Sequence, residues 1–122
     1  MATLTAKLTL TSSDATTDAL NLSISDTLTT TTPSRGLSRL VAATGAATEI
    51  LDDALDAMAY IFIKNTDTTN YVSIATTKAT ISQFARLNPG EFMFFCVQPD
   101  AGVSVQANTA TCVVEYAYWT KG

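Results

Sequence analysis

Residues 60–97 constrain the fold most, because two turn signals separate runs of β-forming residues there. Residues 61–63 and 71–74 are rich in β-branched and aromatic side chains, which favour strands. Between them, Asn65 and Asn70 belong to a polar connection, and asparagine side chains bond nearby backbone and tolerate left-handed conformations. The pattern predicts a hairpin with a polar tip.

The second turn signal is Asn-Pro-Gly-Glu at residues 88–91. Pro89 presets φ at the first central position, and Gly90 can supply the positive φ of a type II turn. A strand reversal is expected here. Residues 92–97, Phe-Met-Phe-Phe-Cys-Val, are apolar on both alternating faces, which indicates a strand covered on both sides, central in a packed sheet or at an interface.

Period-2 alternation predicts further strands before this segment. In residues 3–11, leucine and alanine alternate with threonine and lysine, and residues 20–25 repeat the pattern after a turn at Ser-Ser-Asp. Residues 32–36, Thr-Pro-Ser-Arg-Gly, contain proline and glycine and predict a loop. A separate third strand is expected at residues 37–43.

Residues 46–59 are ambiguous, because their apolar positions follow helical spacing while residues 48–51 also suit a short strand. We expect a strand followed by a loop or one helical turn. Residues 102–107 and 111–119 predict two more strands, and residues 108–110 between them favour a tight reversal.

Eight or nine short strands at hairpin-scale spacing, without βαβ alternation, predict an all-β fold. Threonine, at about one residue in six, also favours strands. A chain of 122 residues suits one domain. The expected architecture is a single antiparallel β-sandwich over residues 1–122, jelly-roll-like, in which residues 1–18 form an N-terminal strand and turn that could serve as an interface arm.

Charge and hydropathy limit the classes of partner that the chain is expected to bind. With a net charge of −4 and only seven scattered basic residues, the chain lacks the basic footprint of a nucleic-acid binder. No apolar run approaches the ~20 residues that span a bilayer, and the N-terminus lacks the regions of a signal peptide. We therefore expect a soluble chain made in the cytoplasm, without nucleic-acid or membrane partners.

The chain offers no marked catalytic site. It contains no histidine, which removes the commonest general base and every Ser-His or Cys-His dyad, and no phosphate or dinucleotide loop is present. We expect no catalytic residue and no cofactor. A carboxylate pair for glycoside hydrolysis, drawn from Asp52, Asp53 and Glu91 or Glu115, is formally possible, but nothing in the sequence fixes their separation.

One acidic cluster, made of Glu49, Asp52, Asp53 and Asp56, has the oxygen ligands that calcium prefers. Its spacing does not match an EF-hand loop, and no glycine lies inside it. A solvated connection is the simpler interpretation, so no metal site is predicted.

The two cysteines, Cys96 and Cys112, are too few for a disulfide framework. Both fall in predicted strands, where cysteine packs as a small apolar side chain. We expect both to be free, with a disulfide or a reactive thiol as the alternatives.

Aromatic side chains suit either a core and subunit interface or a platform that stacks on sugars. The candidates are Tyr60, Tyr71, Tyr116, Tyr118 and Trp119. Arg35, Arg39 and Arg86 suit either solvated positions or ion pairs with a partner. Since the terminal strands have more apolar faces than one core needs, we expect them near a subunit interface. The candidate interface residues are Leu4, Leu8, Arg35, Arg39, Arg86, Tyr118 and Trp119.

Four motifs carry a family resemblance: Gly-Leu-Ser-Arg-Leu-Val-Ala at residues 36–42, Ala-Tyr-Ile-Phe-Ile-Lys-Asn-Thr at residues 59–66, Leu-Asn-Pro-Gly-Glu-Phe at residues 87–92, and Val-Glu-Tyr at residues 114–116. Over roughly residues 20–119 the chain resembles small β-sandwich structural proteins of tailed bacteriophages, including phages of cyanobacteria. The shared motifs are strand and turn residues, not a catalytic signature.

The resemblance implies a noncatalytic virion component, made in the host cytoplasm, of the capsid decoration (cement) type. It implies a homo-oligomer, often a trimer, that binds the major capsid protein or another virion protein. A tail, baseplate or fibre component is the alternative within phages, because those proteins reuse similar sandwiches. A carbohydrate-binding module that stacks sugars on Tyr60, Tyr71, Tyr118 or Trp119 is the alternative from another class.

Overall fold

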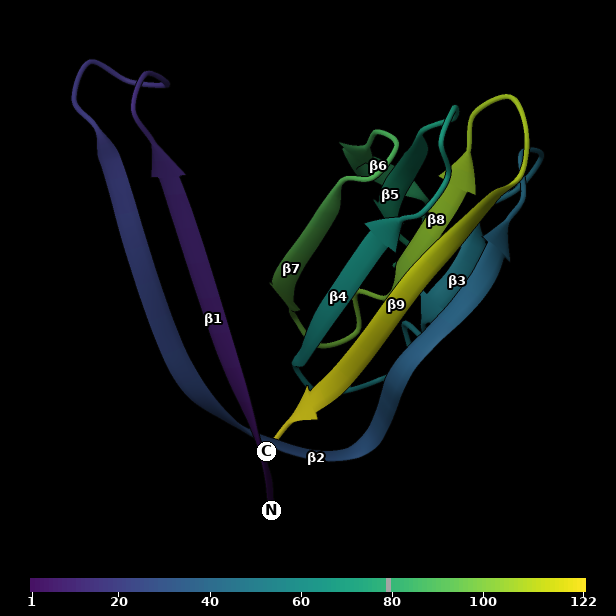
Figure 1. The fold of residues 1–122 in the computed structure, drawn as a ribbon. Coiled ribbons are helices and arrows are strands. Elements are labelled where there is room, and N and C mark those ends of the chain that lie inside the picture. The colour runs from purple at the N-terminus through teal and green to yellow at the C-terminus, as the bar shows by residue number, and fades with distance from the viewer. Residues whose placement is uncertain (79) are drawn as a thin grey trace. The chain divides into compact units, whose positions relative to one another are not determined.

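A computed structural model describes residues 1–78 and 80–122, which form nine β-strands and no helix. The strands are β1 Ala2–Ser12, β2 Leu20–Ala42, β3 Thr48–Leu51, β4 Ala59–Asn65, β5 Val72–Thr76, β6 Ser82–Leu87, β7 Phe92–Val97, β8 Val103–Ala107 and β9 Cys112–Lys121. They make two sheets, in the orders β1-β2-β9-β4-β7 and β3-β8-β5-β6 (Figure 1). The expected antiparallel all-β sandwich is confirmed.

The chain divides into two compact units. Residues 1–31, together with Gly122, form a two-stranded arm, and residues 32–121 form the sandwich. Strand β2 contributes to both units, since its first residues pair with β1 and its last residues lie in the sandwich beside β9. The arm therefore includes the expected N-terminal strand and turn and also residues 19–31.

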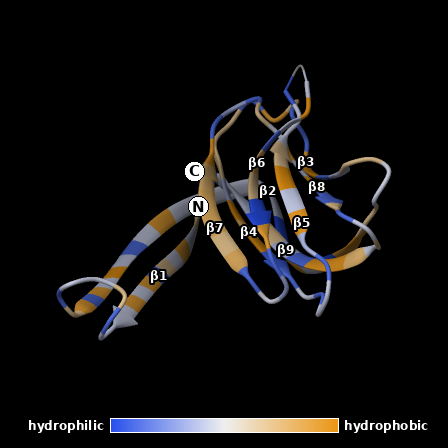
Figure 2. Ribbon diagram, turned by 90° about the horizontal axis from the view of Figure 1, so that it is seen from above, coloured by the Kyte–Doolittle hydropathy of each residue, from blue (hydrophilic) through white to orange (hydrophobic). Residues whose placement is uncertain are grey.

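The arm is an antiparallel ribbon whose register pairs Ala2 with Thr30 and Ser12 with Leu20. Apolar and polar residues alternate along both strands, so that each face of the ribbon collects one kind of side chain (Figure 2). At the far end, the Ser12 hydroxyl accepts hydrogen bonds from the backbone N–H groups of Asp14 and Ala15. The predicted turn is thereby confirmed.

The loop predicted at residues 32–36 is wrong, and so is a separate strand at 37–43, because β2 runs without interruption from Leu20 to Ala42. Pro33 does not interrupt it, and its carbonyl accepts a hydrogen bond from the Thr120 hydroxyl of β9 at 2.5 Å. Gly36 lies in open space. The β propensity of the surrounding threonines therefore outweighs the two turn-forming residues.

The hydrophobic core lies between the two sheets of the sandwich. Strand β4 lies between β7 and β9, and its alternate residues Ile61 and Ile63 are fully buried (Figure 1). The facing sheet contributes Val72, Ile74 and Val105, also fully buried. Period-2 alternation thus directs one face of each sheet inward. The other buried apolar members are Ala42, Ile50, Leu51, Ala59, Leu87, Val97, Ala101, Val103, Ala107, Cys112, Val114 and Tyr116.

The predicted hairpins around residues 64–70 and 88–91 are wrong in their pairing, although the turns exist. β4 belongs to one sheet and β5 to the other, and the same is true of β6 and β7. The reversal at residues 108–110 likewise joins β8 to β9 across the sheets. Each connection is an arch from sheet to sheet, because the strands pair with partners distant in sequence.

Strand β7 was expected to be central in a packed sheet or to lie at an interface. The first alternative is wrong, because β7 lies at the edge of its sheet. Phe92 is 64% exposed and Phe94 is 43% exposed, whereas Met93 and Phe95 pack against the core. One face of β7 is therefore uncovered.

The strand expected at residues 48–51 is confirmed as β3. The expected loop follows, and it includes a turn in which the Asp52 carboxylate accepts a hydrogen bond from the N–H of Ala54 at 2.8 Å. Strand β8 at Val103–Ala107 and strand β9 at Cys112–Lys121 also match their predictions within a few residues.

Candidate functional site

Two sheet-to-sheet connections meet at Asn65, which is fully buried at the end of β4. Its side-chain amide donates to the carbonyls of Asn70 and Leu87 at 2.9 and 3.1 Å, and its side-chain oxygen accepts from the N–H of Asp67. Its backbone N–H donates to the carbonyl of Glu91 at 3.0 Å. Asn65 therefore holds both connections in place and is a structural residue.

The second connection is the type II turn that its sequence predicted. Glu91 donates its N–H to the carbonyl of Asn88 at 3.0 Å, and Gly90 has a φ of +81°. Pro89 precedes it at the first central position. The Glu91 carboxylate also accepts a hydrogen bond from the N–H of Asn88 at 2.7 Å, so this carboxylate is engaged in the turn.

The outer side of the five-stranded sheet carries an aromatic face on the sandwich. Tyr60 lies opposite Cys96 in the register, and Phe62 lies opposite Phe94. The Tyr60 and Phe94 rings stack 6.4 Å apart. We define the aromatic face as Tyr60 and Phe62 of β4, Phe92, Phe94 and Cys96 of β7, and Ala117 and Trp119 of β9.

Sequence reasoning named Tyr60 and Trp119 in this face but missed its phenylalanines. The signal was available: Phe62 alternates with Ile61 and Ile63, and Phe92 alternates with Met93. When both alternating sets are apolar, one set must face away from the core unless a second layer covers it.

The other candidate aromatics do not join this face. Tyr116 is buried in the core, and Tyr118 is partly buried and packs against it. Tyr71 lies in the connection after β4, where the Arg86 guanidinium sits 3.8 Å from the centre of its ring. That geometry is a cation–π contact.

The remaining candidate interface residues are spread over both units. Arg35 donates to the Tyr116 hydroxyl at 3.4 Å, and Arg39 lies 3.6 Å from the Glu115 carboxylate. Leu4 and Leu8 lie on the apolar side of the arm, and Leu8 is 45% exposed. Arg35 and Arg39 therefore belong to the sandwich, and Leu4 and Leu8 belong to the arm.

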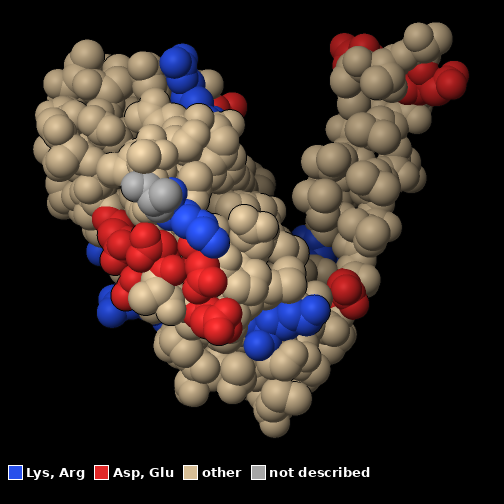
Figure 3. All heavy atoms as spheres, turned by 180° about the vertical axis from the view of Figure 1, so that it is seen from behind, with Lys and Arg blue, Asp and Glu red and all other residues tan. Residues whose placement is uncertain are grey.

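Acidic side chains gather on one side of the sandwich (Figure 3). Partial burial, with help from the nearby charges of Asp52 and Asp53, raises the pKa of Glu49 above its ordinary value of 4.5. The like charges of Glu49, Asp52 and Asp53 therefore lie close enough to disfavour ionisation of Glu49. Among residues 1–78 and 80–122, no group of three or more Asp, Glu, His or Cys side chains is placed to hold a metal ion.

The two cysteines are free and lie in different environments. Cys112 is buried, and this burial raises the pKa of its thiol, with a smaller contribution from the Asp67 carboxylate. Cys96 is exposed on the aromatic face, so the expectation that both thiols are buried is wrong for Cys96. The outward direction follows from its position opposite Tyr60.

In the part of the chain that the structure describes, no helix has the length and apolarity to cross a membrane. Comparison with known proteins finds no matching family model, no similar curated protein and no similar solved structure. The aromatic face and the apolar side of the arm both expose large apolar side chains.

Proposed function

We propose that this chain is a noncatalytic structural protein that assembles into a larger particle through its apolar surfaces. The observation that carries the proposal is the exposure of large apolar side chains on both units, including Leu8 and Ile24 of the arm and Phe92 and Phe94 of the sandwich. Contiguous apolar surface of this kind is typical of protein interfaces. The absence of histidine from the sequence fits a passive role.

The particle that we propose is the virion of a tailed phage, with the chain as a capsid decoration protein. The motif resemblance at residues 59–66 and 87–92 supports this assignment. The strand orders β2-β9-β4-β7 and β3-β8-β5-β6 also interleave as two Greek keys do, so we infer a jelly roll, an architecture common in viral capsid proteins. A tail, baseplate or fibre position is the alternative within the same particle.

Quantitative mass spectrometry of purified virions from a phage that encodes this chain tests the proposal. A decoration protein is expected at a copy number comparable to that of the shell subunit. A few copies per particle would place it in the tail instead. Virions that contain the shell protein but none of this chain would contradict the virion assignment altogether.

A carbohydrate-binding module is a second candidate, because the aromatic face presents stacked rings. Sugar sites usually combine a ring with polar groups that bind hydroxyls. Phe62, Phe92 and Phe94 have no such polar group, and Tyr60 is only 6% exposed. The face therefore favours protein over sugar, and a glycan array probed with the full chain distinguishes the two.

A further inference from the structure

One side of the arm exposes large apolar side chains along both of its strands. Cross-strand pairs Leu4–Leu28, Leu8–Ile24 and Leu10–Leu22 all lie on this side, and threonine, serine and lysine occupy the other (Figure 2). Ile24 is 59% exposed. We define the apolar face of the arm as Leu4, Ala6, Leu8, Leu10, Leu20, Leu22, Ile24 and Leu28.

A ribbon of two strands needs a second layer to be stable. An isolated hairpin is marginal in water, because it gains too little burial to offset the entropy of ordering its residues. The alternation of leucine and threonine in β1 supplies one apolar face and one polar face, as in a sheet that packs on another layer. The apolar face therefore needs an occupant.

We propose that the arm of one copy covers the aromatic face of a second copy of this chain. Each surface supplies what the other lacks: the arm offers flexible aliphatic side chains, and the aromatic face offers exposed rings at Phe92 and Phe94. Both surfaces lie on every copy, so two copies can exchange arms reciprocally in a closed dimer. The inference rests on the proposed function, because it assumes that the chain is an assembling structural protein.

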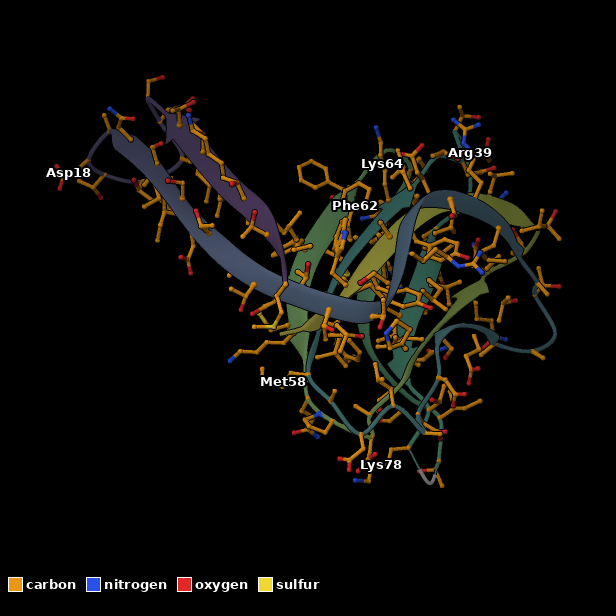
Figure 4. The ribbon with its side chains drawn as sticks, turned by 90° about the horizontal axis from the view of Figure 1, so that it is seen from below. Asp18, Arg39, Met58, Phe62, Lys64 and Lys78 are labelled. Atoms are coloured by element: carbon orange, nitrogen blue, oxygen red, sulfur yellow. The ribbon has the colours of Figure 1, made fainter. Side chains whose placement is uncertain are left out.

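Charge complementarity favours this pairing over contact between two arms. Asp26, opposite Ala6, is the only ionisable side chain on the apolar side of the arm. Beside the aromatic face, Lys64 lies opposite Phe92 and next to Glu115, which is already engaged by Arg39 at 3.6 Å. Figure 4 labels Phe62 and Lys64 together on β4.

The Lys64 ammonium, on the strand position opposite the exposed Phe92, can pair with an incoming carboxylate such as that of Asp26. Contact between two arms would instead bury Asp26 in a leucine surface without a cation. An unpaired carboxylate in such a surface is costly.

The size of the arm also indicates a reciprocal exchange. Strand β1 has 11 residues, which at ~3.3 Å each and with two strands ~5 Å apart gives a ribbon of about 35 by 10 Å. One docked arm then covers about 350 Å² on each partner, or about 700 Å² in total, below the ~1,200 Å² of a typical specific interface. Two reciprocal arms reach about 1,400 Å², which lies within that class.

The first test compares two neighbouring substitutions on opposite faces of β1. Leu8→Lys places a charge on the apolar face, and Thr9→Lys places the same charge on the polar face. By sedimentation of the full chain at micromolar concentration, we expect the wild type and Thr9→Lys to self-associate within about twofold of each other. Leu8→Lys should weaken association at least tenfold, since burial of a leucine contributes ~2 kcal/mol.

Phe94→Lys provides the matching change on the other surface, with Gln83→Lys on β6 as its control. Phe94→Lys should weaken association as strongly as Leu8→Lys, while Gln83→Lys leaves it unchanged. A native far-ultraviolet circular dichroism spectrum and a cooperative melt for each variant exclude unfolding as the cause of weakened association. Equal effects of Leu8→Lys and Thr9→Lys, or association unaffected by Phe94→Lys, would overturn the proposal.

Disulfide trapping identifies the occupant. In a Cys96→Ser background, an Asp26→Cys chain is mixed with a size-tagged Lys64→Cys chain and oxidised. We expect a cross-linked heterodimer on a non-reducing gel. A cross-link within one chain that carries both substitutions, in preference to the heterodimer, would show that the arm covers its own sandwich. A dimer formed by Asp26→Cys alone would show contact between arms, and either result overturns the proposal.

Failure of the arm-exchange proposal can be distinguished from failure of the proposed function. A chain that is a strict monomer in solution but abundant in virions would refute arm exchange and leave the structural role intact. A chain that exchanges arms but is absent from virions would refute the virion assignment alone.

Discussion

The N–H of Gly90 donates a hydrogen bond to the carbonyl of Asn65 at 2.9 Å, and this bond joins two connections that are 25 residues apart in the sequence. The first connection leaves β4 after Asn65, and the second is the turn between β6 and β7. The bond continues the pairing of β4 with β7 beyond Lys64 and Phe92. The Asn65 side-chain amide, which donates to the carbonyl of Leu87 in β6 at 3.1 Å, links the two sheets at this end of the sandwich.

Replacement of Asn65 by alanine should therefore destabilise the sandwich strongly. The change leaves the carbonyls of Asn70 and Leu87 without their amide donor, and Leu87 is buried. We expect a loss of about 2–4 kcal/mol in the free energy of unfolding. Urea denaturation followed by tryptophan fluorescence measures it, with Asn21→Ala on the exposed arm as the control. A loss below about 0.5 kcal/mol would contradict the role of Asn65 in holding the two connections in place.

Alanine substitutions at Gly36, Gly90 and Gly102 should change the stability of the chain to different degrees. At Gly90, φ is +81° and nothing lies within 4 Å of an added Cβ, so only conformational strain of about 1 kcal/mol is expected. At Gly102, φ is +65° and the added Cβ would collide with Thr77 Oγ1 and approach Asp53 Cβ to 2.9 Å. Gly102→Ala should therefore cost clearly more than Gly90→Ala.

Gly36→Ala completes the series, because the site is open and lies inside strand β2. We expect no loss, and a gain of up to about 0.5 kcal/mol from the reduced entropy of the unfolded chain. The order of melting temperatures, Gly36→Ala above Gly90→Ala above Gly102→Ala, checks all three. A reversed order of the last two would contradict the steric argument.

The raised pKa of Glu49 predicts a pH-dependent effect on stability. Since the folded chain holds this carboxyl's proton more tightly than the unfolded chain, stability declines as pH rises from 4.5 through the folded-state pKa and then stays lower. Glu49→Gln should therefore stabilise the chain at pH 7, by less than about 1 kcal/mol at this exposed position, and the difference should vanish below pH 4.5. Melting curves across this range measure it, and Asp18→Asn in the arm is the control.

The two thiols should differ in reactivity. Cys112 is buried and its pKa is raised, so little thiolate forms, whereas Cys96 is exposed. In a Leu8→Lys background, where the aromatic face is free, we expect Cys96 to react with a disulfide reagent at pH 8 at least tenfold faster than Cys112. Cys96→Ser and Cys112→Ala variants assign the two phases. Equal rates would show that Cys112 is accessible in the native chain.

Period-2 alternation was enough to predict most strands, but not the sheet to which each one belongs. Turn chemistry located the reversal at residues 88–91 correctly, and Gly90 has the expected positive φ. It did not reveal that β6 and β7 lie in different sheets, because a turn fixes only the local direction of the chain. Pairing depends on contacts between distant strands, such as β4 with β9.

The surfaces were predictable only in part. Leu8 was expected at an interface and lies on the exposed apolar face of the arm, but Tyr118 packs with the core. The side chain of Tyr118 points inward because Tyr118 lies opposite Ile61 of β4. This register cannot be predicted from the sequence of β9 alone. The exposed side of β7 was missed for the same reason, since its burial depends on the position of β7 at the sheet edge.

The position of β7 at the sheet edge also affects the solubility of the chain before assembly. Natural edge strands usually carry a lysine, a proline or a bulge that discourages other strands from adding to them. Phe92–Val97 has no such residue and combines β propensity with zero charge, the composition of aggregation-prone segments. Newly made chains therefore present an aggregation-prone edge until they meet a partner, and slower synthesis relative to assembly should raise the yield of soluble protein.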